Sequence, residues 1–232
     1  MKKSYIPNTI TALSLFSGFL SIIFTSKGNF QFAAVMIFAA SIFDLIDGIV
    51  ARMLKTSSQF GVELDSLADV VSFGAAPSFL IYSFHFYKFN ALGLILSSLP
   101  LIFGAFRLAR FNSQLIDIET KGDFKGLPIP LAAITISMFV YYVYNNGAFI
   151  KPLYFVSVPL VLIVSAAMLS SIKYSAFPKL NRTTLKGKPV YLILTILGLA
   201  LVFLTDGTAL FYIFLAIVLF GIFRHYYKKI KK

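Results

Sequence analysis

The chain has 232 residues, of which 58% are apolar, and its mean hydropathy is +0.84. Soluble domains are only about 45–50% apolar, so this composition excludes that class and predicts an all-α, polytopic membrane protein. The net charge of +12 would also fit a nucleic-acid-binding protein, so the positions of the basic residues have to decide. No cysteine is present, which excludes a disulfide framework and a cysteine nucleophile.

Apolar stretches near the roughly 20 residues of a membrane-spanning helix recur along the whole chain. They predict eight transmembrane helices, at about 7–26, 30–54, 64–87, 91–111, 127–145, 152–172, 189–205 and 208–226. The second and third helices are the least hydrophobic because they contain several carboxylates. The longest polar segments are predicted at about 112–126 and 173–188, both on the cytoplasmic side.

The basic residues sort by side of the membrane. If the N-terminus is cytoplasmic, 18 of the 21 Lys and Arg residues lie inside, and only Lys27, Lys88 and Lys151 lie outside. Because cytoplasmic loops are enriched in Lys and Arg, this distribution predicts that both termini are cytoplasmic. The same basic face would attract anionic membrane lipids, so nucleic acid is not needed as a partner. We therefore expect an integral protein of the cell membrane whose functional site faces the cytoplasm.

Acidic residues are concentrated in the second and third predicted helices, where residues 44–69 contain five of the nine Asp and Glu residues. Asp44 and Asp47 are three residues apart, and Asp65 and Asp69 are four apart, so each pair lies on one face of its helix. A charge at bilayer depth costs about 3 kcal/mol, so several carboxylates together require a cationic partner. Oxygen ligands without sulfur or nitrogen favour a hard cation such as Mg²⁺ or Mn²⁺.

The connection between these two helices is polar. We predict a turn from Arg52 to Gly61, which makes the two spans an antiparallel hairpin with four carboxylates facing each other. Two other interpretations stay open at this point. The aspartates could belong to an ion-pair network, although only Arg52 and Lys55 lie near them, or they could form the ion site of a cation transporter.

Two glycines stand beside the carboxylates. Gly48 follows Asp47 and Gly61 precedes Asp65 by one turn, and a missing side chain lets a phosphate approach the backbone, although glycine in membrane helices also serves packing. The combined pattern reads Asp44-x2-Asp47-Gly48-x2-Ala51-Arg52-x8-Gly61-x3-Asp65-x3-Asp69. It resembles the signature of the CDP-alcohol phosphatidyltransferases and departs from it at none of the eight fixed positions.

This resemblance implies a membrane-embedded enzyme that transfers a phosphatidyl group from a CDP-lipid to an alcohol and releases CMP. It implies that Asp44, Asp47, Asp65 and Asp69 bind divalent metal and that Asp69 is also the catalytic general base. The six-helix core of the family would occupy residues 1–172, followed by a cytoplasmic loop and two additional helices in 173–232. Because the family often forms dimers, we expect a homodimer.

The CDP-lipid is expected to bind beside the metal. Arg52 and the polar turn would cradle the nucleotide, and Asn8 would add a hydrogen-bond donor and acceptor. The full set expected to bind the CDP-lipid is Asn8, Thr11, Gly48, Arg52, Thr56 and Gly61. An aspartate could act as nucleophile as well as base, but direct transfer is our preferred interpretation.

Three further segments look like the phosphatidylserine synthase branch of that family: Pro7-Asn8-x2-Thr11, Phe106-Arg107-Leu108-Ala109-Arg110-Phe111-Asn112 and Gly126-Leu127-Pro128-Ile129-Pro130. L-Serine has a carboxylate, and the guanidinium pair of Arg107 and Arg110 has the geometry to bind it. The pair could instead be membrane anchors, or could hold the phosphate of glycerol phosphate or inositol phosphate. A non-catalytic lipid-binding scaffold is a further alternative.

Overall fold

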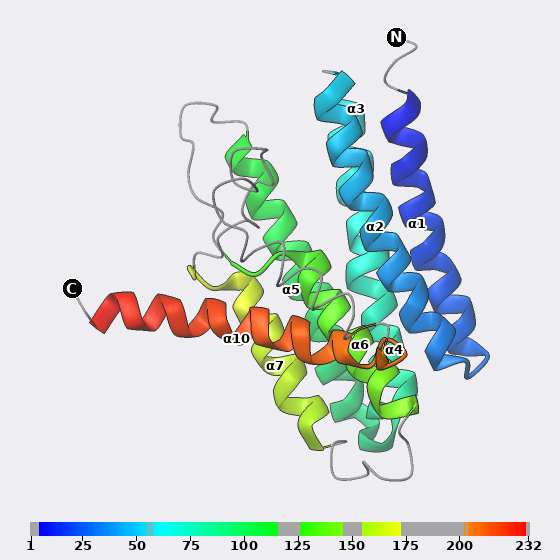
Figure 1. The fold of residues 1–232 in the computed structure, drawn as a ribbon, viewed down its shortest axis with the longest axis vertical. Coiled ribbons are helices and arrows are strands. Elements are labelled where there is room, and N and C mark those ends of the chain that lie inside the picture. Colours follow the sequence, from blue (N-terminus) through cyan, green and yellow to red (C-terminus); the bar gives the residue numbers. More distant parts are fainter. Residues whose placement is uncertain are drawn as a thin grey trace.

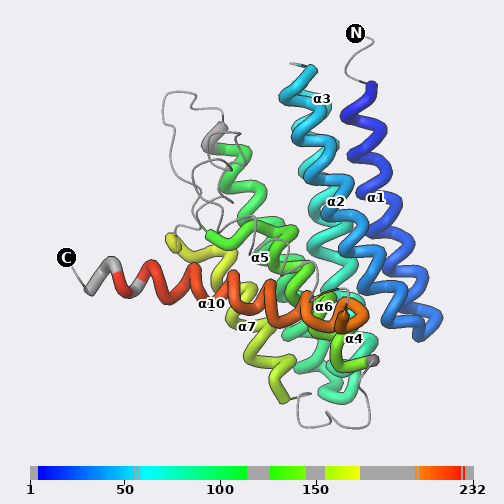
Figure 2. Tube along the Cα trace, viewed as in Figure 1, coloured from blue at the N-terminus to red at the C-terminus, as the bar shows by residue number. Residues whose placement is uncertain are grey.

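The computed structural model describes residues 5–54, 56, 58–115, 126–145, 155–172, 202 and 204–230. Within these ranges the chain is helical and contains no strand, which confirms the all-α prediction. Figures 1 and 2 show the arrangement of the helices. They are α1 (Tyr5–Ser26), α2 (Phe30–Leu54), α3 (Gln59–Asp69), the π-helix η2 (Val70–Ala75), α4 (Ala76–Phe84), the 3₁₀-helix η3 (Phe86–Phe89), α5 (Asn90–Leu115), α6 (Ile129–Asn145), α7 (Ser157–Leu169) and α10 (Ala209–Ile230).

Several helices have the length and composition of membrane spans. Four stretches are long and apolar enough to cross a bilayer: Tyr5–Ser26, Phe30–Leu54, Gln59–Phe84 and Phe86–Ser113. Shorter apolar helices follow at Ile129–Tyr144, Ser157–Leu169 and Ala209–His225. Most of the span predicted at about 189–205 and most of the polar segments at 112–126 and 173–188 lie outside the described residues. The described helices form a membrane helical bundle.

The first helices alternate in direction along the bundle (Figure 1). The start of α1, the end of α2, the start of α3 and the end of α5 therefore lie at the same end of the molecule. α10 runs across the other helices and packs against α6. The acidic half of α2 and the whole of α3 are thus brought to the end at which α1 begins.

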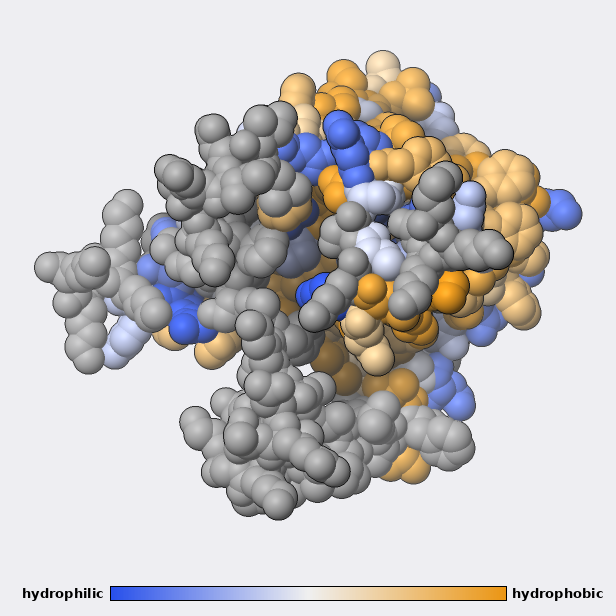
Figure 3. Space-filling model, turned by 90° about the horizontal axis from the view of Figure 1, so that it is seen from above, coloured by the Kyte–Doolittle hydropathy of each residue, from blue (hydrophilic) through white to orange (hydrophobic). Residues whose placement is uncertain are grey.

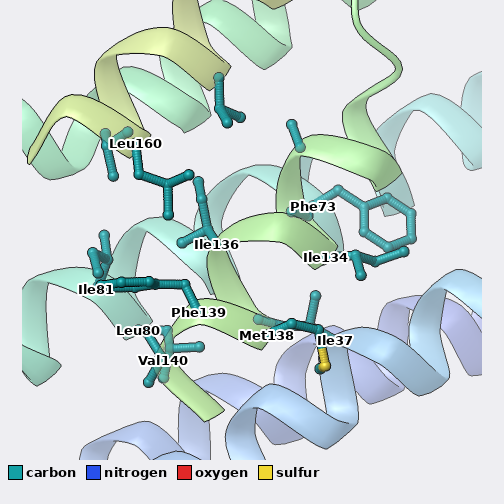
Figure 4. Packing of buried hydrophobic residues seen from close by; sticks show 14 of the residues in the cluster. Ile37, Phe73, Leu80, Ile81, Ile134, Ile136, Met138, Phe139, Val140 and Leu160 are labelled. Atoms are coloured by element: carbon teal, nitrogen blue, oxygen red, sulfur yellow. The ribbon is translucent and has the colours of Figure 1, made fainter. Parts of the chain in front are cut away.

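α6 is the central helix of the bundle. It packs against α2, η2, α4, α5, α7 and α10, and every residue from Ala132 to Val140 is buried. Figure 4 shows side chains of α6 surrounded by Ile37 from α2, Phe73 from η2, Leu80 and Ile81 from α4 and Leu160 from α7. A helix that is apolar on all sides suits the interior of a protein or a membrane, and here the other helices surround it.

α1 packs against α2 and η2 through a face of small and hydroxyl residues. The residues of this face recur at alternating intervals of four and three, the spacing at which two helices stay in contact over several turns. Residues of this size let the helix axes approach closely. They are Pro7, Thr11, Ser14, Gly18, Ser21 and Thr25, all buried.

The turn between α2 and α3 is shorter than predicted. α2 continues through Arg52 to Leu54, and α3 begins at Gln59, so Arg52 and Gly61 lie in helices and not in a turn. The hydroxyl of Ser58 accepts a 3.1 Å hydrogen bond from the backbone N–H of Gly61 and caps α3 at its N-terminus. Such a cap satisfies one of the unpaired N–H groups of the first turn, which explains why α3 starts five residues before the predicted position of about 64.

Candidate active site

Three carboxylates converge between α2 and α3. One oxygen each from Asp44, Asp47 and Asp65 can be chosen so that all three lie within 4.8 Å of one another. Asp47 is only 6% exposed, and the other two are half-buried. Converging anionic oxygens are the ligand set of a hard divalent cation, so the residues present fit a metal ion of that kind.

Asp47 has a further partner on α1. The hydroxyl of Thr11 donates a 2.7 Å hydrogen bond to Oδ2 of Asp47, and it also lies 3.1 Å from the carbonyl oxygen of Pro7 one turn earlier. Because a side chain with a fixed partner cannot rotate freely, Thr11 orients this carboxylate. Three helices therefore shape the acidic group, although α1 contributes no carboxylate to it.

Asp69 lies outside the compact group of three, one helical turn beyond Asp65 and at the last position of α3. Its carboxylate is close enough to Asp44 and Asp65, and to the guanidinium of Arg107 on α5, to interact electrostatically with each. The helix changes to the wider π form immediately after Asp69. π-Helical turns inside α-helices occur frequently at functional sites.

A cleft of about 120 Å³ opens beside the carboxylates, between α1, α2 and the start of α3. It lies at the end of the bundle seen in Figure 3, where hydrophilic residues gather near the middle, beside a hydrophobic outer surface. Five of the six residues predicted to bind the CDP-lipid line it: Asn8, Thr11, Gly48, Thr56 and Gly61. Of the other lining residues, Asp47 and Asp65 were predicted as metal ligands, Pro7 and Ala51 belong to the quoted sequence patterns and Ser58 to the predicted turn, whereas Val62 was not singled out.

The two glycines of the cleft have different surroundings. A Cβ on Gly61 would lie 3.1 Å from Oδ1 of Asn8 and 3.2 Å from Oγ of Ser58, so a hydrogen at this position gives these polar groups room. A Cβ on Gly48 would meet only Nη2 of Arg52, at 4.0 Å, so this wall of the cleft is open. Arg52 itself does not line the cleft but places its guanidinium near that wall.

Arg107 and Arg110 have different partners in the structure. The guanidinium of Arg107 is near enough to Asp69 to interact with it electrostatically, and its buried Nε has no hydrogen-bond partner among the described residues. Arg110 donates a 3.2 Å hydrogen bond from Nη1 to the carbonyl oxygen of Leu169, the last residue of α7. The two guanidinium groups remain close enough to influence each other electrostatically, so the expected pair stays together although each side chain has its own partner.

The segment that begins at Gly126 also packs against the end of α7. The backbone N–H of Gly126 donates to Ile172 O at 2.9 Å, and that of Leu127 donates to Ala167 O at the same distance. Gly126 has a φ of +91°, and a Cβ there would collide with the carbonyl oxygen of Met168. A glycine is therefore required, and this segment fixes the position of the helix end that Arg110 contacts.

The helical bundle with an acidic cleft at one end defines a membrane protein whose converging carboxylates fit a divalent cation. The chain belongs to the CDP-alcohol phosphatidyltransferase family, whose sequence pattern matches residues 4–223. The family assignment from the aspartate signature is thus confirmed. The match extends across the division predicted at residue 172.

Relatives with known names cover most of the chain. The CDP-diacylglycerol–serine O-phosphatidyltransferase of Helicobacter pylori is 38% identical over 229 residues, which are 97% of this chain and 92% of the relative. The archaetidylserine synthase of Methanothermobacter thermautotrophicus is 37% identical over 77% of this chain and 73% of its own. The CDP-diacylglycerol–serine O-phosphatidyltransferase of Bacillus subtilis is 34% identical over 76% of this chain and 93% of its own.

Proposed function

We propose that this protein transfers a phosphatidyl group from a CDP-lipid to L-serine, giving phosphatidylserine and CMP, as a step of phospholipid biosynthesis. The observation that carries the proposal is the convergence of Asp44, Asp47 and Asp65 beside an open cleft in a chain of this family. Serine as the acceptor is supported by the names of relatives that match over nearly the whole chain.

Asp44, Asp47 and Asp65 would hold Mg²⁺ or Mn²⁺, with Asp69 as a further ligand or neighbour. Bound there, the cation neutralises the pyrophosphate and stabilises CMP as it leaves. The hydrogen bond from Thr11 holds Asp47 in the orientation that the site needs.

The cleft is the place for the cytidine diphosphate head, while the lipid chains remain in the bilayer. Gly48 leaves one wall free of side chains, so a phosphate can approach the backbone there, and Gly61 gives room to the polar groups of Asn8 and Ser58. Asn8 and Thr56 present polar groups to the cleft, and Arg52 adds positive charge beside it. These residues, with Thr11, form the proposed CDP-lipid site.

In the proposed reaction the hydroxyl oxygen of L-serine attacks the phosphorus that carries the lipid. The bond from this phosphorus to the CMP oxygen breaks, and CMP departs with the electron pair. Asp69 accepts the serine hydroxyl proton, a role that its place beside the other three carboxylates supports. Transfer is direct, without a phosphatidyl-enzyme.

Arg107 is the stronger candidate for binding the serine carboxylate. Its buried Nε lacks a hydrogen-bond partner, and its guanidinium lies beside Asp69, the proposed base. Binding by Arg107 would therefore bring the serine hydroxyl close to that base. Arg110 contributes either a second contact to serine or support through α7.

We further propose eight transmembrane helices, two cytoplasmic termini, a cytoplasm-facing active site in the cell membrane and a homodimer. The excess of Lys and Arg on one side supports the orientation.

Because the chain has no cysteine, single cysteines introduced at the exposed positions Lys27 and Arg224 can be labelled specifically. In intact cells, a membrane-impermeant thiol reagent should label Lys27→Cys and leave Arg224→Cys unlabelled until lysis. Crosslinking in native membranes tests the dimer.

The decisive experiment measures CMP release from a CDP-lipid by purified protein. L-Serine with Mg²⁺ or Mn²⁺ should give release, and serine without metal should give none. If CMP release is faster with glycerol phosphate or inositol phosphate, that compound is the acceptor instead of serine. Cation flux through proteoliposomes without CMP release would overturn the enzyme assignment in favour of a transporter.

A further inference from the structure

The π-helix that follows Asp69 is in direct contact with α1. Ser72 in η2 is completely buried, and its hydroxyl donates a 3.0 Å hydrogen bond to the carbonyl oxygen of Ser14. Gly18, one turn further along α1, has no side chain at the contact. A Cβ on Gly18 would lie 2.6 Å from Cα of Ser72 and would collide with the Ser72 hydroxyl. The backbone of η2 therefore packs against that of α1.

The same turn of α1 is also attached to α2. The hydroxyl of Ser14 donates a 3.0 Å hydrogen bond to the carbonyl oxygen of Ala40, one turn before Asp44. Thr11, one turn earlier on α1, holds Asp47. α1 thus forms hydrogen bonds to both helices that carry the acidic residues, and Ser14 takes part in two of them.

The π form matters because of its position between Asp69 and Ser72. In a π-helix each backbone N–H bonds to the carbonyl group five residues earlier, so the turn is wider than an α-turn. Asp69 is the last residue before η2, and Ser72 is three residues later, less than one turn away. A contact that holds Ser72 against α1 therefore also constrains the backbone that carries Asp69. The contact with α1 and the place of Asp69 are therefore linked through η2.

We propose that Ser72 is a positioning residue for Asp69, and that its hydrogen bond to Ser14 together with the close approach at Gly18 fixes the π-turn from which the Asp69 carboxylate reaches the reacting serine. This proposal rests on the proposed function, in which Asp69 accepts the serine hydroxyl proton. Ser72 itself does not touch either substrate. It acts by holding the wide turn against α1.

The first test is Ser72→Ala, which removes the hydrogen bond without adding volume. A displacement of the base by a fraction of an ångström should lower kcat about tenfold, since a 1 Å misplacement can cost about 100-fold. The KM for both substrates and the half-saturating Mn²⁺ concentration should change little, because Asp44, Asp47 and Asp65 are untouched. The matched control is Ser137→Ala, another fully buried serine, whose hydroxyl bonds only to Ile134 O within α6. It should keep the parental kcat.

A second variant approaches the same contact from the other side. Gly18→Ala keeps the Ser72 hydroxyl but forces η2 away from α1, so kcat should fall at least as far as in Ser72→Ala. Thermal unfolding in detergent identifies a variant that has lost its fold. Ser72→Ala, which adds no atom, remains interpretable if Gly18→Ala does not fold.

The deciding measurement combines Ser72→Ala with Asp69→Asn in single-turnover experiments. If Ser72 acts through Asp69, Ser72→Ala should not lower the single-turnover rate further in the Asp69→Asn background, because the carboxylate that Ser72 positions is already lost. A purely structural serine would lower the rate by the same factor in both backgrounds, and that result would overturn the proposal, as would a parental kcat for Ser72→Ala. If the proposed function itself is wrong, the parent protein will release no CMP with serine. This outcome is distinguishable from a failure of the Ser72 proposal alone, in which the parent protein remains active.

Discussion

The hydroxyl of Thr11 in α1 lies 2.7 Å from Oδ2 of Asp47 in α2 and donates a hydrogen bond to it, with both residues buried. This bond connects the first helix of the chain to the acidic group on the second. A carboxylate that is held by one oxygen keeps its other oxygen available for a cation. Groups that orient a metal ligand in this way affect metal affinity although they do not touch the ion.

Thr11→Val should therefore weaken metal binding. The valine has nearly the same shape but lacks the hydroxyl, so the Mn²⁺ concentration for half-maximal activity should rise about 10- to 100-fold. The matched control is Thr135→Val in α6, where a buried threonine bonds only to Leu131 O one turn earlier. An unchanged Mn²⁺ titration for Thr11→Val would remove Thr11 from the metal site.

Replacing Asp44, Asp47 or Asp65 by Asn should abolish activity while insertion into the membrane and thermal unfolding stay near parental. Each substitution removes one anionic oxygen donor but almost no volume, so it weakens the ion more than the packing. A chelator should inactivate the parent, and added Mn²⁺ should restore it. Asp206→Asn provides the control, because Asp206 is an exposed carboxylate before α10. Near-parental turnover in one of the three variants would show that its aspartate is not a ligand.

Gly61→Ala should reduce CDP-lipid binding. The new methyl group would sit 3.1 Å from Asn8 Oδ1, at the wall of the cleft, so we expect a higher KM for the CDP-lipid and little change in the KM for serine. Gly104→Ala is the matched control, since its new methyl group would meet Ile129 at an ordinary 3.7 Å. If Gly61→Ala binds the donor as well as the parent does, the head of the CDP-lipid does not occupy this cleft.

The two arginines should respond differently to replacement by lysine. Arg107→Lys keeps the charge and loses the two-pronged geometry, so the KM for serine should rise at least tenfold while that for the CDP-lipid stays constant. Arg110→Lys should mainly lower the thermal stability, because its bond to Leu169 O joins α5 to α7. Equal weakening of both substrates in Arg107→Lys would assign Arg107 to the donor or to the fold.

Asp69→Asn distinguishes a base from a ligand. As a general base, Asp69 contributes about 10²- to 10⁴-fold to turnover, so the amide should lower the single-turnover rate by that factor and leave donor binding largely intact. Its place outside the compact group of three carboxylates favours this outcome. Donor affinity in Mn²⁺, measured by titration, should stay near parental. A fall in donor affinity as steep as the fall in rate would make Asp69 a metal ligand and would defeat its assignment as the base.

The acidic group could be predicted from the sequence because its members are close in the chain and regular in spacing. Asp44 and Asp47 share a helix face, and one short hairpin brings Asp65 to them. The start of α3 was missed, although Ser58 three residues before Gly61 is a recognisable N-terminal cap. The lining residue Val62 has no chemical signal, and only the packing of α1 on the hairpin shows that it borders the cleft.

The π-turn and the different partners of the two arginines could not be predicted. A π-turn has no pattern of its own in the sequence, and the buried hydroxyl of Ser72 within it bonds to the carbonyl oxygen of Ser14, 58 residues earlier. Arg107 and Arg110 are three residues apart, which correctly places them on one side of α5. Their direction depends on Asp69 and on the end of α7, which are remote in the chain. Spacing in the sequence thus predicts which residues share a helix face, whereas tertiary contacts determine which elements that face packs against.

The hydroxyl-rich face of α1 has a consequence for how the protein enters the membrane during synthesis. Alone in a bilayer, α1 would expose the hydroxyls of Thr11, Ser14 and Ser21 to lipid tails, which offer no hydrogen bonds. In the folded chain that face is covered by α2 and, at Ser14 and Gly18, by η2. The turn at Gly28, whose φ is +74°, lets α2 fold back directly after α1. We therefore expect α1 to enter the membrane together with α2, the first helix synthesised that can cover part of this face.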